Sequence, residues 1–323
     1  MPHPTLYITR LLPAPVMTVL RERYTLVSEP ADNQIPNGDD LRQGFAQADA
    51  VICTLADSIT DDLLAAAPRL KIIANYAVGY NNIDVAAATR RGIVVTNTPD
   101  VLTDATADLT WALMLAVARR VVEGDQWARS GRWPGWAPTQ MLGTDVTGKT
   151  LGIIGMGRIG QAVAQRAVGF RMPILYASRR PCSAPQGRAE WTHCPMEDVL
   201  AQSDFISLHL PLSETTRHLI GARELGKMKS TAFLINTSRG PVIDEAALLG
   251  ALQQGTIAGA GLDVYEREPE ILSGLEQLSN VVLLPHLGSA TLNARLKMGM
   301  ICVENIAAVL GGQGPLNPVN RGV

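Results

Sequence analysis

The chain has 323 residues, more than one hydrophobic core usually serves, so we expect two domains. Its 28 lysines and arginines nearly balance its 30 aspartates and glutamates, which excludes the strong positive field of a dedicated nucleic-acid-binding protein. The most apolar long stretch, residues 109–122, is interrupted by two arginines and is too short to span a membrane, so no membrane partner is expected.

The cysteines and the N-terminus indicate the compartment. Cys53, Cys182, Cys194 and Cys302 form no CxxC motif, which indicates neither a metal site nor a disulfide framework. The first residues lack the charged and then apolar pattern of a signal peptide. We therefore expect free thiols, no bound metal and a cytoplasmic location.

Short apolar runs alternate with helical patterns along the chain, which predicts an α/β fold with parallel sheets and crossover helices. In the first hundred residues, strands are expected at 6–9, 50–55, 71–76 and 93–96, with helices at 61–67 and 84–90. One long helix is expected from Ala105 to about Ser130, followed by a Gly-, Pro- and Trp-rich loop at 131–148. Strands then follow at 151–154, 173–177, 205–208, 232–236, 258–264 and 281–284, before a final helix at about 291–310.

A glycine motif follows the first strand of this second series. Gly155, Gly157 and Gly160 form a GxGxxG pattern between the strand and a helical pattern at 161–168. In that setting Gly155 permits a tight turn, Gly157 lets the backbone approach a pyrophosphate, and Gly160 lets the helix pack close to the strand. The motif therefore predicts a dinucleotide-binding turn, with Arg158 and Ile159 among its contacts.

The following strand lacks the acidic residue that an NAD site places about twenty residues beyond the motif. Position 177 is alanine, and Ser178, Arg179 and Arg180 come next. A hydroxyl and two guanidinium groups suit a 2′-phosphate, so NADP is the predicted cofactor, with NAD possible. The alternative is that these arginines are ordinary solvated surface residues.

Three charged side chains follow three strands of the second series: Arg239, Glu268 and His286. In open α/β sheets, ligands bind at the carboxyl ends of the strands. A histidine can protonate the alkoxide that develops when a ketone accepts a hydride, and a neighbouring carboxylate holds its tautomer. A guanidinium suits the carboxylate and carbonyl of a 2-keto acid. Together they predict an enzyme that transfers a hydride between a nicotinamide cofactor and a small 2-keto or 2-hydroxy acid.

These motifs resemble the D-isomer-specific 2-hydroxyacid dehydrogenase family, and within it the glyoxylate/hydroxypyruvate reductases, including 2-ketogluconate reductase. The resemblance covers nearly the whole chain, through residues 75–84, 107–120, 148–160, 227–229, 236–240, 260–264 and 285–289. It implies two Rossmann/flavodoxin-like doubly wound parallel-sheet domains with the active site in the cleft between them. The substrate-binding domain would comprise 1–100 and 291–323, and the dinucleotide-binding domain 101–290. It also implies a homodimer, in which the long helix and the Trp-rich loop embrace the partner.

The resemblance implies a role for each candidate residue. His286 would be the acid/base, Glu268 its partner and Arg239 the cation that orients the substrate. Glu268 rather than Glu266 matches the family spacing, because it lies 29 residues after Arg239. The backbone N–H groups of Val78–Gly79 would bind the substrate carboxylate. The other implied cofactor contacts are Pro211, Thr237, Asp263, Gly288 and Ser289.

The chain departs from these reductases at Gln140, where they carry a tryptophan that reaches into the neighbouring subunit's site. A polar residue there could widen the pocket, so 2-ketogluconate and other larger keto acids stay open as substrates. Oxidation of phosphite, formate or 3-phosphoglycerate on the same scaffold is another alternative, although phosphite oxidation is associated with a lysine where this chain has Val78. The non-enzymatic alternative is a dinucleotide-sensing, corepressor-like protein, against which the intact Arg239, Glu268 and His286 set argues.

Overall fold

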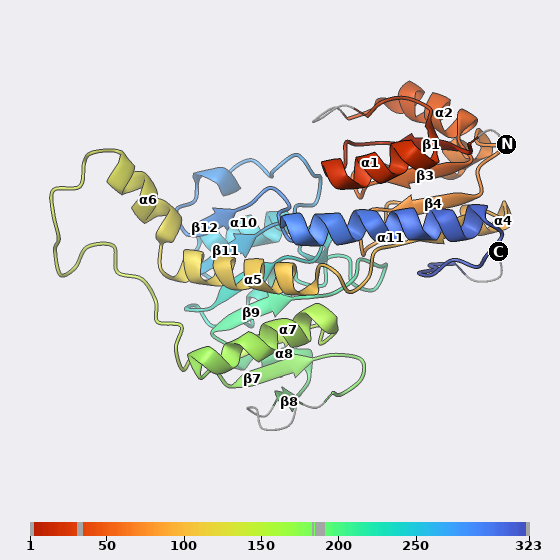
Figure 1. Ribbon diagram of the computed structural model, residues 1–323. Coiled ribbons are helices and arrows are strands. Elements are labelled where there is room, and N and C mark those ends of the chain that lie inside the picture. The colour runs from red at the N-terminus through yellow and green to blue at the C-terminus, as the bar shows by residue number, and fades with distance from the viewer. Residues whose placement is uncertain (1–2, 31–34, 183, 185–190, 321–323) are drawn as a thin grey trace. The chain divides into compact units, whose positions relative to one another are not determined.

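The computed structural model describes residues 3–30, 35–182, 184 and 191–320 (Figure 1). The chain forms two compact units. The first comprises Met1–Leu102 and Ala290–Val323, and the second comprises Thr103–Ser289. The sequence placed these boundaries at residues 100 and 291. Each unit is built on a parallel β-sheet, so the predicted α/β fold class is confirmed.

The first unit has a five-stranded sheet in the order β2-β1-β3-β4-β5, and all its strand pairs are parallel. Its central strands are buried on both faces, as continuous apolar runs predict. Val51, Ile73 and Val95 form a core with three helices on one face, while the C-terminal helix packs along the strands Ile72–Asn75 and Val94–Thr96. The elements are β1 (Thr5–Ile8), α1 (Ala14–Arg23), β2 (Thr25–Leu26), α2 (Gly38–Gln47), β3 (Ala50–Cys53), α3 (Asp61–Ala65), β4 (Ile72–Asn75), α4 (Val85–Arg90), β5 (Val94–Thr96) and α11 (Leu292–Leu310).

The second unit has a seven-stranded parallel sheet in the order β12-β11-β10-β9-β6-β7-β8. Its two faces carry separate cores, one packed under α5 and α7 and the other under α8, α9 and α10. The elements are α5 (Thr103–Ala118), α6 (Val121–Arg129), β6 (Leu151–Ile154), α7 (Arg158–Ala167), β7 (Ile174–Ala177), β8 (Trp191–His193), α8 (Met196–Gln202), β9 (Phe205–Leu208), α9 (Ala222–Leu225), β10 (Phe233–Asn236), α10 (Glu245–Gln253), β11 (Gly259–Leu262) and β12 (Val281–Leu283), with 3-10 turns at Val168–Phe170, Gly240–Val242 and Leu275–Gln277. No helix among the described residues is both long enough and apolar enough to cross a membrane.

The single long helix expected from Ala105 to about Ser130 is wrong, because the structure contains two helices, α5 and α6, there. The chain breaks at Arg120, whose φ of +53° lies in the left-handed region. The returning loop holds this break, since the Thr144 N–H donates to the carbonyl oxygen of Ala118 at 2.8 Å. A Cβ on Gly143 would lie 2.6 Å from that same oxygen, so glycine permits the close approach.

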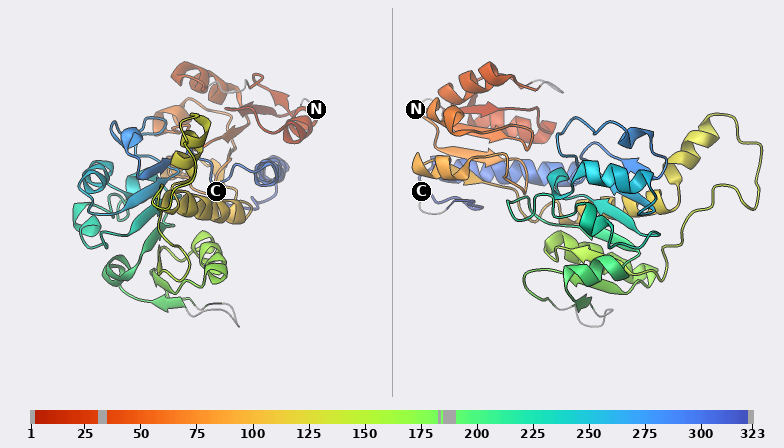
Figure 2. Two further views of the ribbon diagram at one scale, coloured as in Figure 1. Left: turned by 90° about the vertical axis from the view of Figure 1, so that its left-hand side faces the viewer. Right: turned by 180° about the vertical axis from the view of Figure 1, so that it is seen from behind.

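Beyond this break, α6 and residues 130–145 extend away from the rest of the second unit, and we call this segment the arm (Figure 2). None of the α6 side chains is buried. Its loop exposes 82% of Trp136, 53% of Trp133 and 67% of Leu142.

Candidate active site

The glycine motif lies between β6 and α7. Gly155 has a φ of +100°, and a Cβ there would lie 2.4 Å from the carbonyl oxygen of His209. A Cβ on Gly160 would lie 2.2 Å from the carbonyl oxygen of Gly155, so the helix packs against the turn as closely as glycine allows. The Cβ position of Gly157 faces open space, and no side chain caps α7. A phosphate can therefore approach this helix N-terminus, and the turn fits a dinucleotide.

Two other residues follow β9, the strand next to β6. The Nε2 atom of His209 lies 2.8 Å from the Ser207 hydroxyl, and burial lowers the pKa of His209 to about 3. The imidazole is therefore neutral at neutral pH. Pro211 is exposed, and its carbonyl oxygen accepts a hydrogen bond from Thr216 at 2.7 Å.

The segment after β7 carries the two arginines that the sequence assigned to a 2′-phosphate. The Ser178 hydroxyl donates to the carbonyl oxygen of Arg180 at 2.6 Å, and His193 Nε2 lies 3.1 Å from the carbonyl oxygen of Ser178. The side chains of Arg179 and Arg180 are exposed, and neither pairs with a carboxylate within the described part of the chain. Their positive charge is therefore available to an anion.

His286 and Glu268 form a hydrogen bond, with 2.8 Å between His286 Nδ1 and a carboxylate oxygen of Glu268. Burial alone would raise the pKa of Glu268. Hydrogen bonding to His286, the charge of His286, the Tyr265 N–H and the charge of Arg239 together outweigh burial and lower that pKa. An ionised carboxylate only accepts hydrogen bonds, so Nδ1 carries hydrogen and Nε2 is left to exchange a proton with a ligand.

Arg239 follows β10 and lies half-buried in the same unit. Its Nη1 donates to the carbonyl oxygen of Ser238 at 2.7 Å, and Asn236 holds the turn by donating to the Arg239 carbonyl oxygen at 2.9 Å. Burial lowers the pKa of Arg239, and the charge of Glu268 opposes this shift. The guanidinium remains cationic at neutral pH, since arginine is not deprotonated in proteins. The adjacent Gly240 is required, because a Cβ there would lie 1.8 Å from the backbone of Tyr265.

The turn that carries His286 is fixed by Asp263, which is fully buried at the end of β11. The Asp263 carboxylate accepts the N–H groups of Leu287 at 2.6 Å and Gly288 at 2.8 Å, and its carbonyl oxygen accepts the His286 N–H at 3.0 Å. These bonds hold His286 in the left-handed region, with a φ of +54°. Burial raises the pKa of Asp263, whereas the two N–H donors and the charge of His286 lower it, and the net shift is upward.

Two threonines on α5 support the same region, and sequence reasoning did not identify them. Thr106 donates to the carbonyl oxygen of Gly288 at 3.0 Å, and Thr110 donates to that of Thr106 at 2.8 Å. The hydroxyl of Thr237 lies 2.8 Å from that of Thr110. The only sequence signal was two threonines four positions apart, on one face of the helix.

Glu266 lies on the same loop as Glu268 but has another partner, His218. The Glu266 N–H donates to the buried carboxylate of Glu245 at 2.7 Å. Burial raises the pKa of Glu245. The geometry therefore distinguishes the two candidate carboxylates. Glu268 bonds to His286, whereas Glu266 bonds to His218, a histidine outside the predicted set. Ser289, the last residue of this unit, is half-buried.

In the first unit, Val78 and Gly79 lie on the turn that follows β4, and both are half-buried. Gln140, the position of the sequence departure, lies on the arm, where its N–H donates to the carbonyl oxygen of Ala137 at 3.1 Å.

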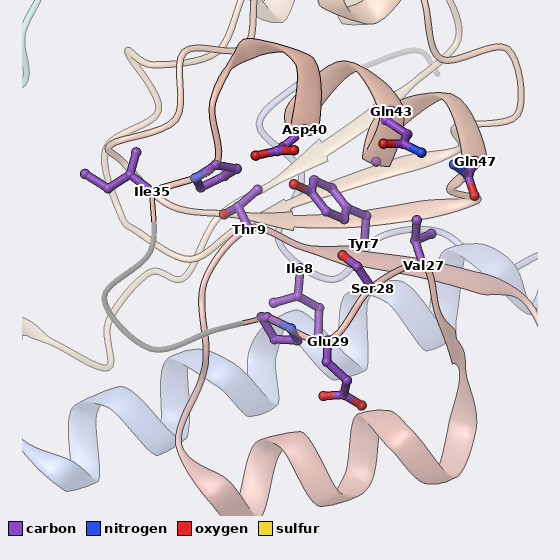
Figure 3. A pocket seen from close by; sticks show the side chains of 13 residues that line it. Tyr7, Ile8, Thr9, Val27, Ser28, Glu29, Ile35, Asp40, Gln43 and Gln47 are labelled. Atoms are coloured by element: carbon purple, nitrogen blue, oxygen red, sulfur yellow. The ribbon is translucent and has the colours of Figure 1, made fainter.

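A cavity of about 380 Å³ lies elsewhere in the first unit, between the end of β1 and α2 (Figure 3). Tyr7, Thr9, Asp40 and Gln43 line it, and Gly44 lets the Tyr7 ring pack against α2. None of the predicted site residues lines this cavity.

Comparison with known proteins identifies the architecture. The family model of the D-isomer specific 2-hydroxyacid dehydrogenase NAD-binding domain matches residues 111–288. The chain is 49% identical to a glyoxylate reductase of Thermococcus gammatolerans, over 99% of this chain and 97% of that protein. It is 50% identical to a glyoxylate reductase of Thermococcus litoralis, over 99% and 98% of the two chains.

Two solved structures share the fold over nearly their whole length. A protein of Thermus thermophilus superimposes with a TM-score of 0.91 at 44% identity, covering 98% of this chain and 100% of that one. An NADPH-dependent glyoxylate/hydroxypyruvate reductase of Sinorhizobium meliloti, in complex with NADP and malonate, has a TM-score of 0.85 at 35% identity and covers 99% and 100% of the two chains.

Proposed function

The chain belongs to the D-isomer specific 2-hydroxyacid dehydrogenase family, and we propose that it reduces glyoxylate and hydroxypyruvate with NADPH, giving glycolate and D-glycerate. The observation that carries this proposal is the His286–Glu268 pair, at 2.8 Å, in the same unit as the glycine motif and Arg239. The names of the similar reductases support the substrate class.

His286, Glu268 and Arg239 are the catalytic residues in this proposal. A reduced nicotinamide, when bound, supplies the hydride that the carbonyl carbon accepts. The Nε2 atom of protonated His286 donates its proton to the carbonyl oxygen, while Nδ1–H stays on Glu268. The negative charge of Glu268 stabilises the imidazolium before the transfer. Arg239 orients the keto acid with its planar donors and stabilises the developing alkoxide.

The substrate carboxylate binds to the backbone N–H groups of Val78 and Gly79. Thr237, Asp263, Gly288 and Ser289 would hold the nicotinamide end of the cofactor, together with Pro211 after β9. The hydroxyl of Thr237 has acceptor capacity left for a carboxamide, because Thr110 already donates to Thr106.

NADPH is preferred over NADH in this proposal because of the segment after β7. A 2′-phosphate adds negative charge where Arg179 and Arg180 offer two cations that pair with no carboxylate among the described residues, beside the Ser178 hydroxyl. Ala177 offers no carboxylate to accept the ribose hydroxyl of NADH, which removes the contact that favours the unphosphorylated cofactor.

The test is a steady-state kcat/KM matrix, followed by absorbance at about 340 nm, the nicotinamide signal of hydride transfer. Glyoxylate, hydroxypyruvate, pyruvate and 2-ketogluconate are each measured with NADPH and with NADH. Strong NADPH-dependent turnover of the first two substrates would support the proposal. If folded protein that binds NADPH turns over none of these substrates, the proposal is contradicted and the dinucleotide-sensing alternative is favoured.

A second substrate, 2-ketogluconate, is favoured by Gln140 alone. The Gln140 amide can both donate hydrogen bonds to and accept them from the hydroxyl groups of a sugar acid, whereas an indole can only donate. If 2-ketogluconate alone is turned over in the same matrix, and Gln140→Trp abolishes that turnover, then 2-ketogluconate and not glyoxylate is the preferred substrate.

We also propose a homodimer formed through the arm. An isolated helix of nine residues is too short to be stable in water, yet α6 buries no side chain in its own chain. Trp133, Trp136 and Leu142 expose large apolar surfaces beside it, as interfaces do. Sedimentation equilibrium should give twice the 34.6 kDa chain mass, and Trp136→Ser should weaken the association. A monomer in the wild type would contradict this.

The cysteines support the cytoplasm as the location. Cys53, Cys182, Cys194 and Cys302 are all free thiols. Burial raises the pKa of Cys53 and Cys302, which keeps both as unreactive thiols. A reducing compartment preserves this state.

A further inference from the structure

Three consecutive carbonyl groups on the turn after β4 are each held by a hydrogen bond. The Ala77 oxygen accepts the Thr98 N–H at 2.9 Å. The Val78 oxygen accepts the side-chain amide of Asn97 at 2.7 Å, and the Gly79 oxygen accepts that of Asn75 at 2.8 Å. Two of the three bonds therefore come from asparagine side chains.

These bonds fix where the N–H groups of the turn point. The peptides here are trans, and in a trans peptide the C=O and the following N–H point in opposite directions. Because each of the three carbonyl groups points toward its hydrogen-bond donor, the N–H of the following residue points away from that donor. These are the N–H groups of Val78, Gly79 and Tyr80. None of these three N–H groups donates to a residue in the part of the chain that the structure describes. Three backbone donors in sequence are thus left for an external acceptor.

The sheet places the two asparagines side by side. Ala74 pairs with Thr96 in the parallel register of β4 and β5, so Asn75, the last residue of β4, lies next to Asn97, the residue that follows β5. The Oδ1 atom of Asn75 is 3.4 Å from the Asn82 amide and 3.5 Å from the Cys53 thiol, both of them donors. Because both neighbours donate to Oδ1, the fully buried Asn75 amide is oriented with its nitrogen toward Gly79.

We propose that Asn75 and Asn97 are positioning residues that hold the turn so that the N–H groups of Val78, Gly79 and Tyr80 bind the substrate carboxylate. The inference rests on the proposed function and adds to it a third N–H donor and the two side chains that orient the three donors. Neither asparagine touches the substrate, and both act through the carbonyl groups of the turn. A carboxylate held by three fixed N–H groups is discriminated strongly from an uncharged ester, since bonds to a charged acceptor are the stronger ones.

The test compares Asn97→Ala with a matched control, Asn320→Ala. Alanine removes the donor without adding a charge that would itself repel the substrate. Asn320 is also a buried asparagine of this unit, and its amide donates to the Ile93 carbonyl oxygen at 2.9 Å, but it does not contact the turn. For each protein, kcat/KM is measured with glyoxylate and with its methyl ester, together with the melting temperature and the Kd for NADPH.

We expect Asn97→Ala to reduce the acid-to-ester preference by about ten-fold or more, with the Kd for NADPH unchanged. Asn320→Ala should lower the melting temperature and leave the preference at the wild-type value. An unchanged preference in Asn97→Ala, or an equal loss in both variants, would overturn the positioning role. If the wild type itself showed no preference for the acid over the ester, the proposal that this turn binds the substrate carboxylate would be contradicted. The positioning role of the asparagines would then be contradicted as well. If Asn97→Ala does not fold, Asn97→Ser is measured in its place against the same two outcomes.

Discussion

The turn around His286 and the segment after β7 both follow strands of one sheet, yet they are held very differently. The His286 turn donates three N–H groups to Asp263 and accepts one hydrogen bond from Thr106, and the backbone of His286 is fixed in the left-handed region. The segment at Ser178–Arg180 has two exposed arginines and is tied by the Ser178 hydroxyl and His193. Proton transfer requires a fixed distance, whereas attraction of a phosphate requires only nearby positive charge. The comparison therefore predicts sharp losses at the first region and graded losses at the second.

The largest expected effect is that of His286→Ala. Loss of the proton donor should reduce kcat by about 10²- to 10⁴-fold, while the Kd for NADPH stays near the wild-type value. His218→Ala is the matched control, because His218 is also paired with a carboxylate in this unit, that of Glu266. Comparable losses of kcat in the two variants would show that any broken ion pair has this effect, and that His286 has no special role.

A smaller effect is expected at the cofactor end. The double variant Arg179→Ala/Arg180→Ala should lower the kcat/KM preference for NADPH over NADH by about 10- to 100-fold, because both side chains are exposed and partly screened by salt. Arg171→Ala, at an exposed arginine before β7, should leave that preference unchanged. Equal losses with the two cofactors would show that the pair does not recognise the 2′-phosphate.

Thr106→Val tests whether the His286 turn depends on α5. The change keeps the shape of the side chain but leaves the buried carbonyl oxygen of Gly288 without its donor, at a cost of about 1–3 kcal/mol in unfolding free energy. We expect kcat to fall several-fold, with little change in the NADPH-to-NADH preference. Thr18→Val, at a threonine that donates within α1, is the control for the substitution itself. A stability loss without any loss of kcat would separate Thr106 from the turn's function.

The smallest effect is a pH dependence of stability. The pKa of Glu268 is lower in the folded protein than the unfolded value of about 4.3, so its pairing stabilises the fold above that value and is lost as the pH falls through the folded pKa. Urea unfolding of wild type and Glu268→Gln should therefore give free energies that converge as the pH falls from about 6 to about 3. A difference that stays constant over this range would show that the ionisation of Glu268 does not contribute.

Much of the fold could be predicted because it depends on local patterns. The bounds of β6 and β9 match the expected strands to the residue, since each is a continuous apolar run. The edge strands β2 and β8 were missed, because they are short and, unlike the similarly short β5 and β12, contain polar residues in place of a continuous apolar run. The break at Arg120 was missed because a distant loop, through Thr144, holds it there, and arginine does not by itself indicate a left-handed residue.

The site divides in the same way. The glycine motif and the strand-end positions of Arg239, Glu268 and His286 can be predicted from sequence, because strand ends of parallel sheets meet at one edge. The supporting bonds of Thr106 and Asn97 could not be predicted, since each joins segments that only the folded chain brings together. The bond from Asn75 to Gly79 spans only four residues, but no pattern in the sequence indicates it.

The most direct test of the central claim is the product of hydroxypyruvate reduction. The protein is incubated with hydroxypyruvate and NADPH, and the glycerate formed is resolved into its enantiomers and counted against the NADPH consumed. We predict D-glycerate alone, in equal number to the NADPH oxidised. L-glycerate, or no NADPH oxidation by folded protein that binds the cofactor, would contradict the proposed reaction.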